Sequence, residues 1–152
     1  MNHCIRYGST LLLAFAAVLM CSCASNLSNS SVPGPADPDA PTEFTTSESG
    51  LKYRIMRRSD GRKPTASQRV KVHYRGWFDD GTEFDSSYKR GEPTSFSLNG
   101  VIPGWTEGIP LVGEGGMIEL EIPSDLGYGP RGNRSVPPNA TLHFTVELLE
   151  VL

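Results

Sequence analysis

The sequence predicts an α+β domain in which about five antiparallel strands pack against one short helix. Apolar and polar residues alternate in several short runs, which is the period-two pattern of half-buried strands. Only residues 103–109 show a pattern that could form a helix. The 16 glycines and 12 prolines also favour a turn-rich β architecture over a helical bundle.

The individual elements follow from these runs and from the residues that interrupt them. Asp80-Gly81 supplies a hairpin turn before residues 82–85. The helix begins at Pro103 and is limited to about two turns, because Gly108 and Pro110 follow. The predicted strands are residues 51–55, 70–75, 96–98, 118–122 and 142–148.

Residues 1–22 are predicted to be an export signal rather than part of the fold. Arg6 supplies a positive charge, and Leu11 to Met20 is an unbroken apolar run. Such a run is too short to cross a bilayer, because a hydrocarbon core of about 30 Å needs roughly 20 helical residues. The alternative interpretation is a short buried helix of a cytosolic protein.

The cysteines point to a lipid anchor rather than to disulfide bonds. All three, Cys4, Cys21 and Cys23, lie in or beside the predicted signal, so the rest of the chain has no disulfide framework. Ser22-Cys23 resembles the lipobox of bacterial lipoproteins, which implies diacylation of Cys23. Ala24 follows in place of Asp, which resembles lipoproteins sorted to the outer membrane and implies a place in the cell envelope, facing the periplasm or the cell surface.

The domain organisation follows from a change in composition near residue 47. Residues 23–46 comprise the lipidated cysteine and a segment rich in Ser, Pro, Asn and Asp without an apolar period, which we expect to be a disordered tether. Residues 47–152 form the single predicted domain.

Several function classes are disfavoured by charge and spacing. The net charge is −3 and no basic stripe is present, so the sequence offers no positively charged surface for binding nucleic acid. The glycines of residues 127–132 match a dinucleotide fingerprint, but Pro130 prevents a helix from starting there. His73 and His143 lie on the polar phase of predicted strands and are expected to face solvent. We therefore predict no metal and no cofactor.

The informative residues are aromatic and occur in five ordered motifs that span about 100 residues. Together these motifs resemble those of FKBP-type peptidyl-prolyl cis-trans isomerases. They are Val72-His73-Tyr74-x-Gly76, Asp80-Gly81-x-x-Phe84-Asp85-Ser86-Ser87, Val101-Ile102-Pro103-Gly104-Trp105-x-Glu107-Gly108, Leu126-Gly127-Tyr128-Gly129 and Pro137-Pro138-Asn139-Ala140-Thr141-Leu142-x-Phe144.

The resemblance implies a curved antiparallel sheet wrapped around one short helix, with a pocket between them. Trp105 would form the floor and receive the substrate prolyl ring. The hydroxyl of Tyr128 and the backbone N–H of Ile102 would each donate a hydrogen bond to a substrate carbonyl, and Asp85 would be a polar group at the rim. The implied catalytic residues are Phe84, Asp85, Trp105 and Tyr128, and the implied substrate-binding residues are Tyr74, Phe96, Val101, Ile102 and Phe144.

The resemblance also implies rotamase activity on proline-containing polypeptides and binding of the family's macrolide inhibitors. An alternative is a chaperone or binding module that holds proline-containing segments without turnover. We expect a monomer, because the long N-terminal helical region through which some bacterial relatives dimerise is absent. Two departures from the family pattern are expected to affect substrate preference: Thr94 replaces an aromatic wall residue, and the short loop of residues 130–136 carries Arg131 and Arg134.

Overall fold

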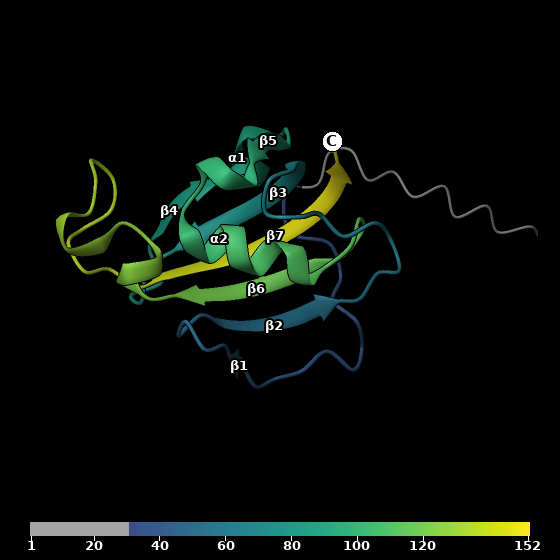
Figure 1. Ribbon diagram of the computed structural model, residues 1–152, viewed down its shortest axis with the longest axis horizontal. Coiled ribbons are helices and arrows are strands. Elements are labelled where there is room, and N and C mark those ends of the chain that lie inside the picture. The colour runs from purple at the N-terminus through teal and green to yellow at the C-terminus, as the bar shows by residue number, and fades with distance from the viewer. Residues whose placement is uncertain (1–30) are drawn as a thin grey trace, which may run out of the picture.

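The computed structural model describes residues 31–152, so the predicted signal, Cys23 and the first part of the tether lie outside the described residues. Figure 1 shows one antiparallel sheet with α2 lying across one of its faces. The strands are ordered β1-β2-β6-β7-β3-β4, and β5 pairs with β3 beside β4. Their bounds are β1 Thr45–Thr46, β2 Lys52–Arg57, β3 Arg69–Trp77, β4 Glu83–Ser86, β5 Thr94–Ser97, β6 Met117–Ile122 and β7 Leu142–Val151.

The helices are short. α2 spans Pro103–Gly108 and begins with a proline at its first turn, as the sequence predicts, and it continues into the 3-10 turn η2, Ile109–Leu111, which was not predicted. A second helix, α1, spans Ser87–Arg90 and was not predicted; the side chain of Ser86 caps it by accepting from the N–H of Lys89. Three further 3-10 turns are η1 Leu98–Gly100, η3 Ser124–Leu126 and η4 Gly129–Arg131.

The alternation of β6 shows how the two faces of the sheet differ. Ile118, Leu120 and Ile122 are fully buried in the core beneath α2. On the opposite face Glu119 pairs with Arg54 at 2.7 Å and Glu121 pairs with Lys52 at 2.6 Å, both across the β2–β6 register. The sheet therefore has an apolar face covered by α2 and a polar face crossed by ion pairs, which is the arrangement that the period-two pattern predicts.

The predicted boundary at residue 47 is corrected by the structure. Residues 34–46, expected to be tether, lie along the edge and polar face of the sheet. The N–H of Gly34 donates to Glu147 Oε1 at 2.5 Å, and the N–H of Asp37 donates to the carbonyl of Met56 at 2.7 Å. β1 then pairs with β2. The segment has no apolar period because polar contacts, rather than buried apolar side chains, hold it in place.

The expectation that His73 faces solvent is wrong. The residue is 6% exposed, and its ring shares a hydrogen bond of 2.9 Å with Ser87 Oγ and stacks on Tyr88 at 4.8 Å. The polar face of the sheet is covered at this point by α1, so the polar phase of β3 does not mean exposure. His143 is partly exposed, pairs with Asp79 Oδ1 at 2.7 Å and stacks on the indole of Trp77.

Within residues 31–152, no helix combines the length and the apolar composition that a bilayer crossing requires.

Candidate active site

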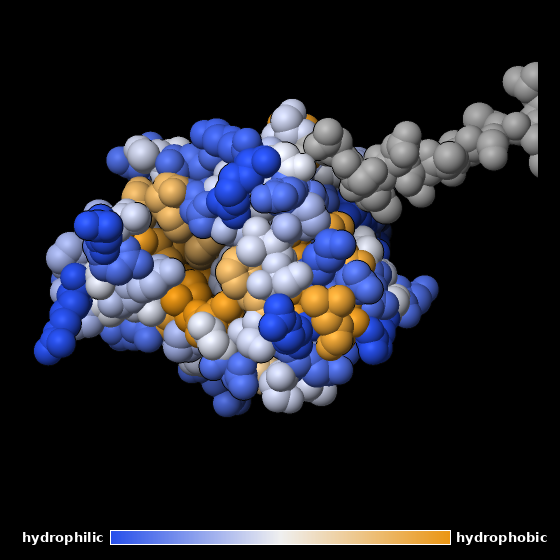
Figure 2. All heavy atoms as spheres, turned by 90° about the horizontal axis from the view of Figure 1, so that it is seen from above, coloured by the Kyte–Doolittle hydropathy of each residue, from blue (hydrophilic) through white to orange (hydrophobic). Residues whose placement is uncertain are grey.

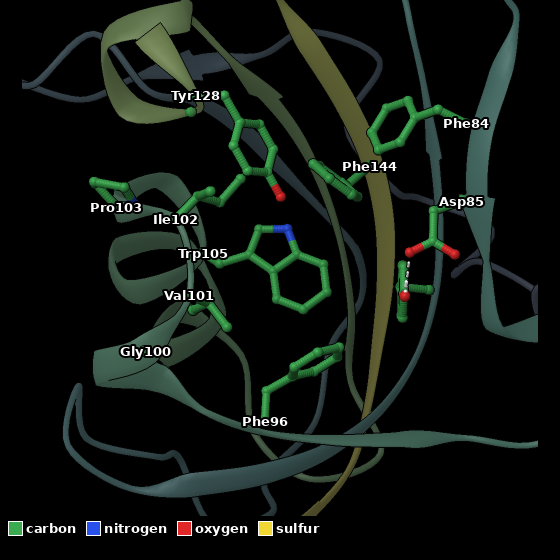
Figure 3. Close-up of a pocket in the computed structure, with 12 residues that line it drawn as sticks. Phe84, Asp85, Phe96, Gly100, Val101, Ile102, Pro103, Trp105, Tyr128 and Phe144 are labelled. Carbon is green, nitrogen blue, oxygen red and sulfur yellow. Dashed lines mark hydrogen bonds between the residues drawn. The ribbon is translucent and has the colours of Figure 1, made fainter. Parts of the chain in front are cut away.

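A cavity of about 540 Å³ opens between α2, the sheet and the turns that follow β6. Figure 2 shows it as a hydrophobic hollow bordered by hydrophilic side chains, and Figure 3 shows the side chains that line it. All nine residues to which the sequence assigned catalytic or binding roles line this one cavity. The lining residues are Tyr74, Phe84, Asp85, Phe96, Gly100, Val101, Ile102, Pro103, Trp105, Gly127, Tyr128 and Phe144.

Trp105 of α2 forms the floor of the cavity and is only 4% exposed. Three rings stand edge-on to its indole: Tyr74 at 5.2 Å, Phe144 at 5.2 Å and Phe96 at 5.3 Å between ring centroids. Such perpendicular pairs are the favoured geometry of aromatic rings. The result is an apolar box whose walls come from β3, β5 and β7 and whose floor comes from α2.

The polar groups that face the cavity are few. The indole Nε1 of Trp105 is buried and has no hydrogen-bond partner among the described residues. In Figure 3 this nitrogen and the hydroxyl of Tyr128 point toward the same part of the hollow. Tyr128 is 41% exposed and stands at the mouth. A buried donor without a partner is unfavourable, so the indole N–H is available to an acceptor that enters the cavity, and the hydroxyl of Tyr128 can exchange water for the same acceptor.

Gly76 in β3 explains how two wall rings come so close to the backbone. A Cβ atom at this position would lie 2.7 Å from Phe144 Cε1 and 2.7 Å from Phe84 Cζ. The two rings meet edge to face at 5.5 Å. Any side chain at residue 76 would therefore displace the wall of the cavity.

Asp85 at the rim is held by two neighbours. The hydroxyl of Tyr74 donates to Asp85 Oδ2 at 2.5 Å, and Arg90 pairs with Asp85 Oδ1. Arg90 also donates to the hydroxyl oxygen of Tyr74 at 2.9 Å and to Thr94 Oγ1 at 3.3 Å. Burial, followed by the hydrogen bond to Asp85, raises the pKa of Tyr74 to about 12, so its hydroxyl stays protonated near neutral pH.

The roles of Arg90 and Thr94 differ from those that the sequence predicted. Arg90 was not predicted as part of the site; the signal that could have found it is its place in the short turn directly after Asp85. Thr94, expected as a wall residue, does not line the cavity and instead binds Arg90. Asp85 is thus fixed by partners from β3 and α1, which suits it to orient groups at the rim.

The histidines and the predicted lipidation site lie apart from the cavity or outside the described residues. Among residues 31–152, no group of three or more His, Cys, Asp or Glu side chains could hold a metal ion. His73 and His143 lie outside the residues that line the cavity. Cys23, the predicted lipidation site, lies outside the described residues.

Comparisons with known proteins agree with this geometry. FkpA of Escherichia coli strain K12, described as an FKBP-type peptidyl-prolyl cis-trans isomerase, is 53% identical over 106 residues, which cover 70% of this chain and 39% of that protein. The chain thus spans less than half the length of this relative. The crystal structure of E. coli FkpA matches with a TM-score of 0.71 and 50% identity, over 73% of this chain and 52% of that chain.

The match to a second solved structure covers a larger share of the solved chain. A peptidyl-prolyl cis-trans isomerase from Pseudomonas syringae pv. tomato matches with a TM-score of 0.67 and 34% identity, over 73% of this chain and 82% of that chain. The family model described as FKBP-type peptidyl-prolyl cis-trans isomerase matches residues 60–149, a range that contains every residue of the aromatic cavity. The fold, the cavity and these matches together place the chain in the FKBP-type peptidyl-prolyl cis-trans isomerase family.

Proposed function

We propose that this protein catalyses cis-trans isomerisation of X-Pro bonds in polypeptides, with the prolyl ring bound over Trp105. The observation that carries the proposal is the box of edge-on aromatic rings around a buried indole, open to solvent on one side and bordered by few hydrogen-bond donors. Residues Tyr74, Phe84, Phe96, Val101, Ile102 and Phe144 would contact the substrate.

The chemistry suits such a cavity because no bond is made or broken. Rotation about an X-Pro bond faces a barrier of about 18–20 kcal/mol and takes tens of seconds without a catalyst. The planar amide is charge-separated, and the twisted transition state is less so at its C–N bond. A water-poor apolar cavity therefore disfavours the planar ground state relative to the twisted state.

The polar groups would position the substrate rather than exchange protons with it. Tyr128 would donate a hydrogen bond from the mouth, and the buried Nε1 of Trp105 offers a second donor. Asp85, already bound by Tyr74 and Arg90, would orient the rim. The macrolide inhibitors of the family would bind the same cavity.

The test is turnover of a proline-containing peptide by the purified mature protein, measured in an isomer-specific protease-coupled assay and independently by NMR exchange. We expect catalysed exchange that a family macrolide inhibits. Peptide binding without acceleration would instead support the binding-module alternative, and absence of both would contradict the assignment of the cavity.

We also propose that the protein is a monomer anchored in the bacterial cell envelope through a lipid on Cys23, and that it serves exported proteins. The apolar run that ends at Ser22-Cys23 supports this proposal. Cys23→Ser should release the protein from the membrane fraction and abolish labelling by radioactive palmitate, whereas Cys21→Ser should do neither. Membrane-bound, labelled Cys23→Ser protein would refute the anchor. Light scattering of the detergent-solubilised protein would test the monomer.

A further inference from the structure

Two exposed arginines in the loop that follows the mouth residue Tyr128 have no acidic partner among residues 31–152. Arg131 ends η4, directly after the mouth residue Tyr128, and Arg134 follows in the same loop; both are exposed. Neither forms a salt bridge within residues 31–152. Apart from Arg69, the other described arginines each pair with a carboxylate: Arg54, Arg57, Arg58, Arg62, Arg75 and Arg90.

The loop that carries these arginines is tightly built. Asn133 lies between them, and its Oδ1 accepts from the N–H of Ser135 at 2.8 Å and from that of Val136 at 2.9 Å. The N–H of Asn133 donates to the carbonyl of Val136 at 2.9 Å, and Val136 is 4% exposed in the core. These bonds hold the backbone around Arg134, and the N–H of Gly132 donates to the carbonyl of Gly129 at 3.3 Å around Arg131, so both arginines extend from hydrogen-bonded backbone.

The segment between β6 and β7, which includes the mouth residue Tyr128, carries more positive than negative charge, although the whole chain carries −3. The rim carboxylate of Asp85 is already paired with Arg90. In the segment between β6 and β7, Asp125 is the single carboxylate against the two guanidinium groups. Because Gly127 and Tyr128 of this segment line the cavity, a substrate that enters the hydrophobic hollow in Figure 2 passes a segment with net positive charge.

We propose that Arg131 and Arg134 select substrates that carry Asp or Glu within about three residues of the isomerised proline. The proposal rests on the function proposed above. Arg131 follows the cavity-lining Tyr128 by three residues, and a chain advances at most about 3.6 Å per residue, so a side chain within about three residues of the proline is expected to reach this loop while the prolyl ring lies over Trp105. A guanidinium binds a carboxylate through two parallel hydrogen bonds, and unpaired charge at a cleft also accelerates the encounter with an oppositely charged ligand.

The test compares peptides that differ only in one charge. Two series carry Glu, Gln or Lys at the second position after the proline or at the second position before it. For the mature protein we measure kcat/KM by NMR exchange and Kd from Trp fluorescence. In at least one series we expect kcat/KM to decrease from Glu to Gln to Lys, with a Glu-to-Lys ratio of roughly three- to tenfold at low salt. About 1 M salt should bring that ratio close to one.

Variants of the loop test whether its two arginines cause the preference for acidic peptides. Arg131→Gln combined with Arg134→Gln should bring the Glu-to-Lys ratio close to one, and Arg131→Glu with Arg134→Glu should invert it. Lys63→Gln removes one positive charge from the β2–β3 loop, which Figure 1 shows at the other end of the sheet, and should leave the ratio unchanged. All these side chains are exposed, and thermal unfolding verifies that the variants are folded.

The outcomes separate this inference from the proposed function. Equal kcat/KM and equal Kd for Glu and Lys peptides would overturn the selectivity, even if every peptide were isomerised. A ratio that survives in the double Gln variant would also overturn it, because another group would then be responsible. Charge-selective Kd without turnover of any peptide would support the inference while refuting the isomerase. Failure of every peptide to bind would refute both.

Discussion

Adding one methyl group at Gly76 tests whether the wall of the cavity depends on contact between ring and backbone. The new Cβ would lie 2.7 Å from both Phe84 Cζ and Phe144 Cε1, whereas ordinary contact begins at 3.4 Å. Both rings must therefore move by several tenths of an ångström. Phe144 is 5% exposed and packs against Trp105, so Phe84, which is less buried, is expected to move farther.

The expected change in the free energy of unfolding follows from two opposing effects. Overpacking a well-packed site destabilises by about 1–3 kcal/mol. Alanine also restricts the unfolded chain more than glycine does, which offsets roughly 0.4–1 kcal/mol. We expect Gly76→Ala to lower the free energy of unfolding by about 1–2 kcal/mol, which corresponds to roughly 4–10 °C in Tm. Because the displaced rings would contact substrate, kcat/KM should fall by about tenfold or more.

Gly100→Ala is the matched control. Gly100 also lines the cavity, but a Cβ there would meet nothing within 4 Å. Its Tm and kcat/KM should stay close to wild type. In the Gly76→Ala background, Phe84→Leu should restore part of the lost stability by removing the ring edge. Equal Tm and equal kcat/KM in Gly76→Ala and Gly100→Ala would show that the wall does not depend on the glycine at residue 76.

Three further predictions concern the floor, the mouth and the polar face. Trp105→Ala should destabilise by about 3–5 kcal/mol and remove turnover and macrolide affinity; a folded variant with full activity would place the site elsewhere. Tyr128→Phe should reduce kcat/KM by only about fivefold, the worth of one neutral hydrogen bond near 1 kcal/mol, and wild-type kcat/KM should be flat between about pH 6 and 8.5; a bell-shaped profile would argue for acid-base catalysis instead. Burial lowers the pKa of His73 below its ordinary 6.5, so the unfolded chain binds more protons than the folded one as pH falls through that value. Chemical denaturation should therefore show wild type losing stability between about pH 7.5 and 5.5, with a smaller loss in His73→Gln, and equal losses would show that His73 contributes nothing.

The main strands could be predicted from the sequence because apolar and polar residues alternate within each of them. β6 is an example: Ile118, Leu120 and Ile122 alternate with glutamates, and the structure buries one set and pairs the other with cations. The elements that were missed show no such alternation. α1 has four residues, and the contacts of residues 34–46 are with main-chain groups, arginine side chains and a carboxylate elsewhere in the sequence.

The cavity could be predicted only through the family motifs. Its aromatic residues are scattered from Tyr74 to Phe144, and no local period indicates that they meet around Trp105. Arg90 was not predicted as a site residue because its ion pair with Asp85 depends on the turn that α1 makes, which the motif does not describe. His73 was misplaced for a related reason: alternation assigns a side chain to a face of the sheet, but another element can cover that face.

The position of β7 bears on how the chain folds as it is synthesised. β7 follows every other strand in the sequence, yet it lies in the middle of the sheet, between β6 and β3. The strand pairs β2–β6 and β3–β4 can form early, but nothing joins them until residues 142–151 have been made. Closure of the sheet is thus delayed to the end of the domain, and such distant pairings form slowly. A chain that must cross a membrane before it folds would gain time from this order of strands.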